Sequence, residues 1–355
     1  MSDSRAIAKA ADYLVYDKEK KVYRQDPEQA VRDDVEKHYW LHVLRTIAKD
    51  WRLYLMLVPM VLVFLFWRYF PMYELLGCFK VSDQTLPVAD QLFSGFYNFK
   101  VLLMGSDTMS LEFFRALRNT FVLSFYGLIF GFPIPIILAL FFNEIKSNVL
   151  RSVYQVLTYL PKFMSTVIIT SLVIMLVKQG AQTSSMGIIS QALEKLGLIT
   201  YDVGNAGLLN QPQFFRAIFI ISGIWEDAGY GSIVFFAAII SISPTSYEAA
   251  QIDGAGKMAQ MRYVVLPSIL STIVIMLITK IGSLLSIGYE KVLLLYNANT
   301  FITADVVSTF ANRYGLEGAS KGIASAAEMM SNVIAMLLVI GANTIARKAS
   351  DTSLY

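Results

Sequence analysis

The chain has 355 residues, of which 55% are hydrophobic, and its mean hydropathy is +0.52. Several stretches approach the roughly 20 apolar residues that a membrane-spanning helix needs, so the sequence predicts a polytopic membrane protein rather than a soluble domain. The formal net charge of +3 implies no nucleic-acid footprint, and a single cysteine, Cys78, excludes an intrachain disulfide framework.

The first 50 residues are charged, mixed in sign, and lack the pattern of a secretory signal peptide. A set of apolar side chains at helical spacing, followed by Lys49 and Arg52, predicts an amphipathic helix on the cytoplasmic surface: Tyr39, Trp40, Val43, Leu44 and Ile47. His38 and His42 are spaced i, i+4, but Tyr39 stands where a zinc protease carries Glu. The packed interfacial helix is therefore favoured over a metal site.

Six apolar segments follow, and they predict an all-α bundle of six membrane helices. The expected spans cover residues 53–73, 119–142, 153–177, 214–242, 267–288 and 322–346. Pro133 and Pro135 are expected to kink the second span. The predicted organisation is an N-terminal extension, a transmembrane domain and a short tail, at residues 1–50, 51–348 and 349–355.

The loop between the fourth and fifth spans, residues 243–267, has the pattern of a compact helix-turn-helix. Ser243 can cap its first helix, with Pro244 at the first helical position. Thr245 and Glu248 also have capping-box spacing, which leaves the start of this helix open.

The same loop carries a stop signal and small side chains. Asp253-Gly254 is expected to end the first helix, and a second short helix is expected from Gly256 to about Tyr263. Ala249 and Ala250 give the first helix a shallow surface that a partner can approach closely. The loop is therefore interpreted as a fixed piece that docks onto another protein.

These residues resemble the EAA motif of permeases from binding-protein-dependent ABC importers. The motif runs E-A-A, three residues, G, nine residues, I-x-L-P, and Val264 in place of Ile is the one departure here. The resemblance implies a coupling helix that is seated in a groove of a cytoplasmic ATPase. The residues it assigns to coupling are Tyr247, Glu248, Ala249, Ala250, Asp253, Gly254 and Ala255.

The resemblance extends from about residue 50 to residue 348, and it is to the LplB-type branch of polysaccharide and oligosaccharide permeases within the maltose-type importers. The segments that carry it are residues 116–120, 131–133, 158–161, 224–226, 288–297, 303–306, 342–343 and 346–348.

One stretch of the loop looks like the end of a phosphate-binding loop, Gly254-Ala255-Gly256-Lys257. The P-loop pattern needs Gly at position 251 and Ser or Thr at position 258, where the chain has Gln251 and Met258. The sequence therefore predicts no ATPase site of its own and no catalytic residues.

Charged side chains interrupt three of the expected spans, at a cost of roughly 2.5 to 3.5 kcal/mol each on insertion scales. They either pair to fix helix packing or line a wet cavity that binds sugar through carboxylates and aromatic faces. Neighbours on a helix point about 100° apart, so they cannot all face one ligand. The candidate substrate residues are Trp225, Glu226, Asp227, Tyr230, Lys280 and Glu328.

The resemblance implies half of the membrane channel of an oligosaccharide importer. Its implied partners are a second permease in a heterodimer, two ATPase subunits that carry ATP and Mg, an extracellular sugar-binding protein and the sugar. It further implies the bacterial cytoplasmic membrane as the location, with both termini cytoplasmic and no cofactor or metal on this chain.

Two further classes of protein remain as alternatives. An ion-coupled secondary sugar transporter often has two repeated halves, and no repeat is seen across the midpoint of this chain. An intramembrane enzyme needs a metal motif or a nucleophile and base, and none stands out.

Overall fold

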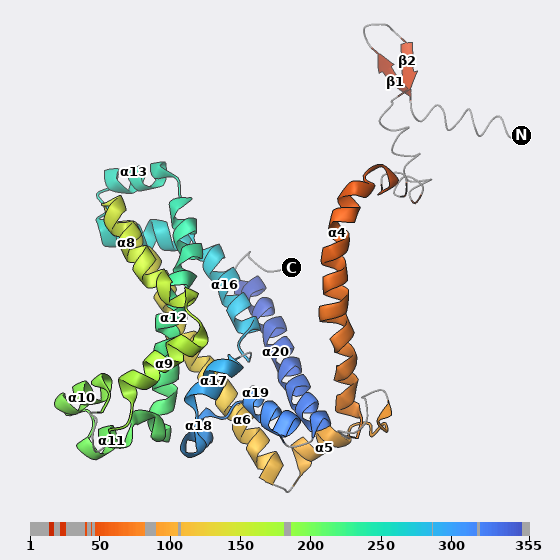
Figure 1. Ribbon diagram of the computed structural model, residues 1–355. Coiled ribbons are helices and arrows are strands. Elements are labelled where there is room, and N and C mark those ends of the chain that lie inside the picture. The colour runs from red at the N-terminus through yellow and green to blue at the C-terminus, as the bar shows by residue number, and fades with distance from the viewer. Residues whose placement is uncertain are drawn as a thin grey trace, which may run out of the picture. The chain divides into compact units, whose positions relative to one another are not determined.

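The computed structural model describes residues 14–17, 22–25, 40, 44, 47–81, 90–105, 108–180, 186–285, 287–317 and 320–349. These residues are almost entirely helical, which confirms the all-α membrane bundle, and they include one pair of short strands. The chain divides into two compact units, residues 1–74 and 75–355. Each unit is described by itself (Figure 1).

The first unit contains a hairpin that the sequence did not predict. Strands β1 (Leu14–Asp17) and β2 (Val22–Gln25) pair antiparallel, with Leu14 opposite Gln25. The hairpin lies inside the expected N-terminal extension. Of the residues predicted to form the amphipathic helix, Trp40, Leu44 and Ile47 are helical and exposed, and Tyr39 and Val43 lie outside the described residues. The amphipathic helix therefore stays a prediction.

The first span begins in this unit as one helix of 29 residues, Trp51–Phe79, that is apolar enough to cross a membrane. It comprises α4 (Trp51–Phe64), a π turn η1 (Leu65–Tyr69) and a 3-10 segment η2 (Phe70–Phe79).

The second span, at Thr108–Glu144, begins eleven residues before its predicted start. It comprises α6 (Thr108–Tyr126), a π turn η4 (Gly127–Gly131) and α7 (Pro133–Glu144). Pro133 lacks an N–H and its ring crowds the preceding turn. The chain absorbs this as a widened turn, so the expected distortion takes the form of a π turn within one continuous helix.

The third span is not the single run that was predicted. Helix α8 (Asn148–Tyr159) continues as the 3-10 turn η5 (Leu160–Phe163), and α9 (Thr166–Val177) then leaves at 100°. Met164 and Ser165 are extended, and the Ser165 hydroxyl accepts a hydrogen bond from the Ile168 amide at 3.4 Å. A new N-cap after a proline-containing turn therefore starts a second helix in another direction.

The fourth span is the unbroken helix α12 (Pro212–Ile240), within two residues of its prediction. The fifth begins ten residues earlier than predicted and bends by 61° at Ile269. Its parts are α14 (Lys257–Gln260), η7 (Met261–Val265), α15 (Leu266–Ser268) and α16 (Leu270–Gly282). The sixth span is α20 (Lys321–Ala349). The described residues thus hold four helices that are candidate spans and two bent helix pairs that are each a candidate span.

The segments between the spans are mostly short helices, where the sequence indicated loops. They are α5 (Tyr97–Met104), α10 (Ile188–Lys195), α11 (Tyr201–Ala206), η6 (Leu208–Asn210), α17 (Tyr289–Leu295), η8 (Ala298–Thr300), α18 (Phe301–Ala304), α19 (Val307–Asn312) and η9 (Arg313–Glu317). In Figure 1, α10, α11 and α18 lie at the end of the second unit opposite α13 (Pro244–Ile252).

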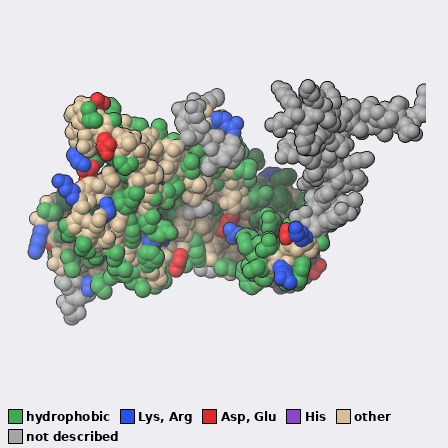
Figure 2. Space-filling model, turned by 90° about the horizontal axis from the view of Figure 1, so that it is seen from above, with side chains coloured by type: hydrophobic (Ala, Val, Ile, Leu, Met, Phe, Trp, Pro, Cys, Tyr) green, Lys and Arg blue, Asp and Glu red, His purple; other side chains and the backbone are tan. Residues whose placement is uncertain are grey.

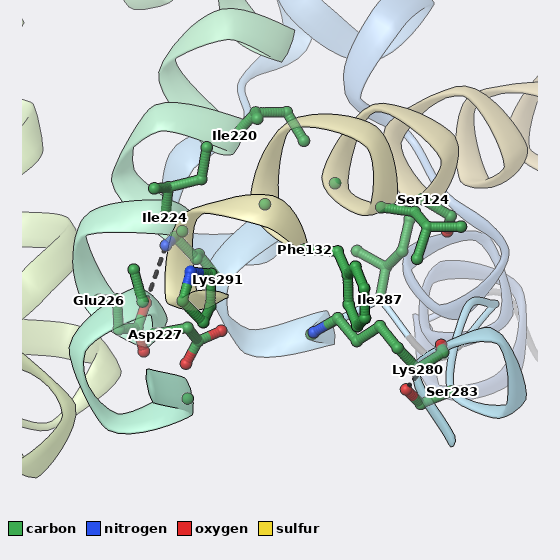
Figure 3. Close-up of a pocket in the computed structure, with 18 of the residues that line it drawn as sticks. Ser124, Phe132, Ile220, Ile224, Glu226, Asp227, Lys280, Ser283, Ile287 and Lys291 are labelled. Atoms are coloured by element: carbon green, nitrogen blue, oxygen red, sulfur yellow. Dashed lines mark hydrogen bonds and ion pairs between the residues drawn. The ribbon is translucent and has the colours of Figure 1, made fainter. Parts of the chain in front are cut away.

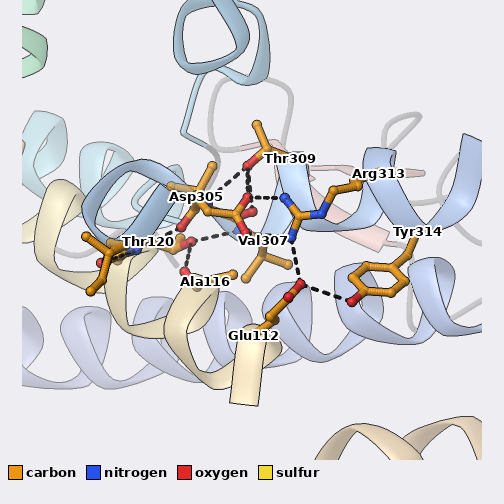
Figure 4. Close-up of polar contacts among 11 residues, drawn as sticks. Glu112, Ala116, Thr120, Asp305, Val307, Thr309, Arg313 and Tyr314 are labelled. Carbon is orange, nitrogen blue, oxygen red and sulfur yellow. Dashed lines mark hydrogen bonds and ion pairs between the residues drawn. The ribbon is translucent and has the colours of Figure 1, made fainter. Parts of the chain in front are cut away.

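A buried polar network fixes α18, α19 and η9 onto α6 (Figure 4). The Arg313 guanidinium donates to Asp305 at 2.8 Å and to Glu112 at 3.0 Å, and it joins two carboxylates from different segments. Tyr314 donates its hydroxyl to Glu112 at 3.0 Å, and Thr309 donates to Asp305 at 2.7 Å. Because every charge in this network has a partner, it holds residues 301–317 against the second span.

A hydrophobic cluster at the α13 end holds α7, α12 and the fifth span together. Its buried members are Ala139, Phe235, Ile239, Val265 and Ile269, and Tyr247 of α13 packs against it. The cluster therefore anchors α13 to the membrane helices. Figure 2 looks onto the molecule from this end and shows Lys, Arg, Asp and Glu side chains scattered among apolar ones on the second unit.

Candidate functional site

The first element of the site is α13. Of the two predicted starts of this helix, the structure has the one at Ser243. Ser243 occupies the N-cap position and Pro244 the first helical position. The Ser243 hydroxyl does not bond the helix amides. It lies 2.7 Å from the Thr245 hydroxyl instead.

The helix ends in a Schellman turn, as the glycine predicted. Gly254 has φ of +78°. The amide of Gly254 donates to the Gln251 carbonyl at 3.0 Å, and the amide of Ala255 donates to the Ala250 carbonyl at 2.8 Å. A Cβ at Gly254 would meet nothing within 4 Å, so the backbone conformation alone requires glycine there. This turn sets the angle between α13 and α14.

The predicted coupling residues divide between two faces of this loop. Tyr247, Ala250 and Ala255 are half-buried, whereas Glu248, Ala249, Asp253 and Gly254 are exposed. Two large apolar neighbours are also exposed, Ile252 at 86% and Met258 at 74%. The outward surface of α13 and α14 thus combines small, apolar and acidic side chains.

The end of the second span interacts with this loop. Lys257 lies 3.3 Å from Glu144, at the end of α7. Burial, with the nearby Glu144 carboxylate, raises the pKa of the Tyr247 phenol, so this side chain is neutral at physiological pH. The loop therefore contacts the helix bundle on its inner side.

The second element of the site is a cavity of about 630 Å³ in the second unit. Its lining comes from α6, η4, α7, η5, α9, α12, α16 and α17, and most of it is apolar (Figure 3). The polar exceptions face one another across the space, which is the usual composition of a small-molecule site.

Two ion pairs stand on adjacent residues of α12. Glu226 accepts from Lys291 of α17 at 2.8 Å, and these side chains are only 14% and 10% exposed. Asp227 accepts from Lys162 of η5 at 2.6 Å, with 53% and 41% exposed. The Lys291–Glu226 pair is thus largely withdrawn from solvent, whereas the Lys162–Asp227 pair remains accessible from the cavity.

The structure brings together four of the six predicted substrate residues. Glu226, Asp227, Tyr230 and Lys280 line the cavity. Trp225 and Glu328 are exposed and are not among the lining residues. Trp225 is adjacent to Glu226 on α12 and therefore points in another direction, and Glu328 lies on α20. The sequence left open whether Glu226 and Asp227 pair with other charges or line a cavity. In the structure, both residues do both.

Three charged lining residues were missed. Lys162, Glu290 and Lys291 all line the cavity. They fall at a span end or in an expected outer segment, where charge is ordinary, so hydropathy gave no reason to single them out. The sequence offered only weak signals. Lys162 follows a proline, and Glu290 and Lys291 lie in the tyrosine-containing segment 288–297 that resembles the permease family.

Comparison with known proteins assigns this architecture. Residues 131–345 match the family model described as "Binding-protein-dependent transport system inner membrane component". Protein LplB of Bacillus subtilis (strain 168) is 34% identical over 316 residues, which cover 89% of this chain and 94% of the relative. The polygalacturonan/rhamnogalacturonan transport system permease protein YteP of the same organism is 32% identical over 355 residues, with both chains fully covered.

A solved structure agrees with the fold. The chain resembles part of a bacterial ABC transporter involved in the import of the acidic polysaccharide alginate, with 38% sequence identity and a TM-score of 0.74. The match covers 86% of this chain and 99% of that one. The same TM-score and identity hold for that transporter in complex with an alginate pentasaccharide-bound periplasmic protein.

Proposed function

Because the chain belongs to the family of binding-protein-dependent transport system inner membrane components, we propose that it forms one half of the channel of an ATP-driven oligosaccharide importer. The second half is a different permease of the same family. Two cytoplasmic ATPase subunits bind ATP and Mg, and an extracellular sugar-binding protein delivers the substrate. This chain performs no covalent chemistry and has no nucleotide site.

The observation that carries the proposal is the geometry of α13. The helix presents an exposed face with Glu248 and Ala249, its inner face is held by Tyr247, and a Schellman turn at Gly254 fixes its direction. A helix that packs against the bundle on one side transmits the movement of a bound ATPase to the membrane helices better than a flexible loop does. α13 is therefore assigned as the coupling helix that contacts an ATPase.

This assignment orients the chain in the bacterial cytoplasmic membrane. α13 faces the cytoplasm, and α10, α11 and α18, at the opposite end of the second unit, face outward. With up to six spans, both termini then lie on the cytoplasmic side.

The proposed substrates are oligosaccharides or polysaccharide fragments. The relative YteP is named for polygalacturonan and rhamnogalacturonan, and the similar solved transporter imports alginate. In this chain the cavity of about 630 Å³ offers carboxylates, ammonium groups and the aromatic faces of Phe132 and Tyr230. Such groups bind sugar hydroxyls and ring C–H surfaces.

The proposed transport mechanism depends on α12, which runs without a break from the cavity toward α13. Asp227 lines the cavity and α12 continues to Ile240, so at 1.5 Å per residue these 13 steps span about 20 Å, and a three-residue turn then leads to Pro244 at the start of α13. Because α12 joins the cavity directly to α13, movement of the ATPases displaces α12 together with its two ion pairs. Alternating access then opens the cavity to either side of the membrane.

The test is ATP-dependent sugar uptake in vesicles that contain both permeases, the ATPases and the binding protein. We propose that Glu248 pairs with a basic group of the docked ATPase. Glu248→Ala is therefore expected to reduce uptake and ATPase recovery in pull-down together, because truncating one side of a charge pair buried at an interface costs about 2–5 kcal/mol. Insertion and binding-protein docking should persist. Normal uptake and normal ATPase recovery would contradict the coupling assignment, and uptake that needs an ion gradient but not ATP would favour a secondary carrier.

A further inference from the structure

Lys280 differs from the other lysines that line the cavity. Lys162 and Lys291 are each held by a carboxylate of α12, at 2.6 and 2.8 Å. Among the residues that the structure describes, none forms a hydrogen bond or ion pair with the Lys280 ammonium group. The cavity therefore contains one cation that this part of the chain leaves uncompensated.

The position of Lys280 places its unpaired charge in the cavity. It lies in the last turn of α16, within the fifth span, and its side chain is exposed rather than packed. Figure 3 shows it reaching into the cavity from the side opposite Glu226 and Asp227. A charged side chain at membrane depth is costly, and such residues mark substrate pathways when they face a wet cavity.

The surrounding groups define what could occupy the space in front of Lys280. Glu226 and Asp227 are already engaged by lysines, and Glu290 is the remaining lining carboxylate, which forms no ion pair with the described residues. Phe132 adds an aromatic face. The cavity thus offers a free cation, a free hydrogen-bond acceptor and an apolar wall.

We propose that Lys280 is the subsite for a carboxylate of the transported sugar, so that the substrate is an oligosaccharide that contains uronic acid residues. This inference rests on the proposed function and narrows it. The Lys280 ammonium donates charge-assisted hydrogen bonds to a sugar carboxylate. Glu290 accepts hydrogen bonds from hydroxyl groups, and Phe132 covers ring C–H atoms.

Two alternative roles for the Lys280 charge lead to different outcomes. If an acidic residue of the partner permease neutralises Lys280, loss of the charge weakens assembly and affects all sugars alike. If hydration alone satisfies the ammonium group, loss of the charge leaves sugar binding unchanged.

The experiment measures equilibrium binding of a labelled galacturonate trisaccharide and of its carboxyl-reduced, neutral counterpart. The protein is the purified transporter, with both permeases and the ATPases but without the sugar-binding protein, so the binding protein cannot impose the preference. Lys280→Gln removes the charge and Lys280→Arg keeps it. Lys178→Gln is the matched control, because Lys178 is exposed and is not among the lining residues. Detergent-stable yield is measured for each variant.

Loss of a charge-assisted hydrogen bond predicts that Lys280→Gln weakens binding of the acidic trisaccharide about tenfold and that of the neutral one less than about twofold. Lys280→Arg and Lys178→Gln should bind the acidic sugar as the wild type does. Equal binding of both sugars by the wild type, an equal loss of both in Lys280→Gln or unchanged binding in that variant would overturn the carboxylate subsite. Uptake of neutral sugars with ATP would leave the proposed function standing, whereas no ATP-dependent uptake of any sugar would overturn the function itself.

Discussion

At the scale of single residues, Glu226 and Asp227 show how one step along a helix changes the role of a carboxylate. Both pair with a lysine, but the Lys291–Glu226 pair is 10% and 14% exposed, whereas the Lys162–Asp227 pair is 41% and 53% exposed. Solvent screens the second pair and has little effect on the first. The buried pair therefore fixes α17 to α12, whereas under the proposed function the exposed pair is the one that substrate can reach.

This difference gives the first prediction. Glu226→Gln should destabilise the folded transporter by about 3 kcal/mol, because it leaves the Lys291 ammonium buried without its counter-charge. Asp227→Asn should cost at most about 1 kcal/mol and should instead change the sugar concentration that gives half-maximal uptake. Thermal unfolding in detergent and uptake in vesicles, measured on both variants, separate the two effects. Equal stability of both variants would contradict the assignment of a structural and a functional pair.

Gly254 gives the second prediction at this scale. Its φ of +78° excludes a β-branched side chain, although the space around it is open. Gly254→Val should lower ATPase recovery in pull-down and ATP-dependent uptake, because the α13 turn cannot form without strain of about 1–3 kcal/mol. Gly254→Asn should be milder, since Asn tolerates this conformation.

Gly256 supplies the matched control for that substitution. It lies two residues further on in the same turn, its φ is −68°, and a Cβ there also meets nothing within 4 Å. Gly256→Val should therefore leave ATPase recovery nearly normal. Similar losses in both variants would mean that bulk on this surface, rather than the direction of α13, governs attachment.

At the scale of elements, the sequence predicted the spans that long apolar runs define and missed their breaks. The fourth span is within two residues of its prediction, whereas the third and fifth bend by 100° and 61°. Hydropathy reports burial in the bilayer and not direction, so the extended Ser165 and the bend at Ile269 left no hydropathy signal. The short outer helices were missed because helices of this length depend on tertiary packing.

The candidate site, like the spans, was predicted only in part. The α13 loop was predictable because its signals, a capping residue, a proline and a stop glycine, are local. The cavity was half predictable, since the intramembrane charges of α12 and α16 stand out in apolar runs. Their partners did not, because Lys162 and Lys291 are each 65 residues away in sequence from the carboxylate that they contact. Only the fold brings them together.

Arg313 gives the prediction at this scale. It joins Asp305 and Glu112 and so ties η9 and α18 to α6 (Figure 4). Arg313→Met should destabilise the outer segment by about 3 kcal/mol or more, because it leaves two partly buried carboxylates without a counter-charge. Faster proteolysis or amide exchange of residues 301–317, with normal ATPase recovery, is the expected result. Unchanged exchange there would show that packing alone holds this segment.

At the scale of the whole molecule, the two compact units differ in what they contribute. The cavity, the Arg313 network and α13 all lie in the second unit, residues 75–355. The hairpin of β1 and β2 belongs to the first unit. None of the described side chains that line the cavity comes from before residue 75.

This separation gives the last prediction, which concerns deletion of residues 1–36. The deletion removes the hairpin and keeps α4 and every other candidate span. Membrane insertion is driven by the transfer of apolar helices into the bilayer, and the sequence of the deleted residues contains no apolar run long enough to span it. The shortened chain should therefore reach the membrane at normal levels, assemble with its partners and bind sugar with unchanged affinity. Membrane-embedded protein measured by fractionation, together with ATPase pull-down, checks this, and loss of embedded protein at normal expression would show that the hairpin takes part in folding or assembly.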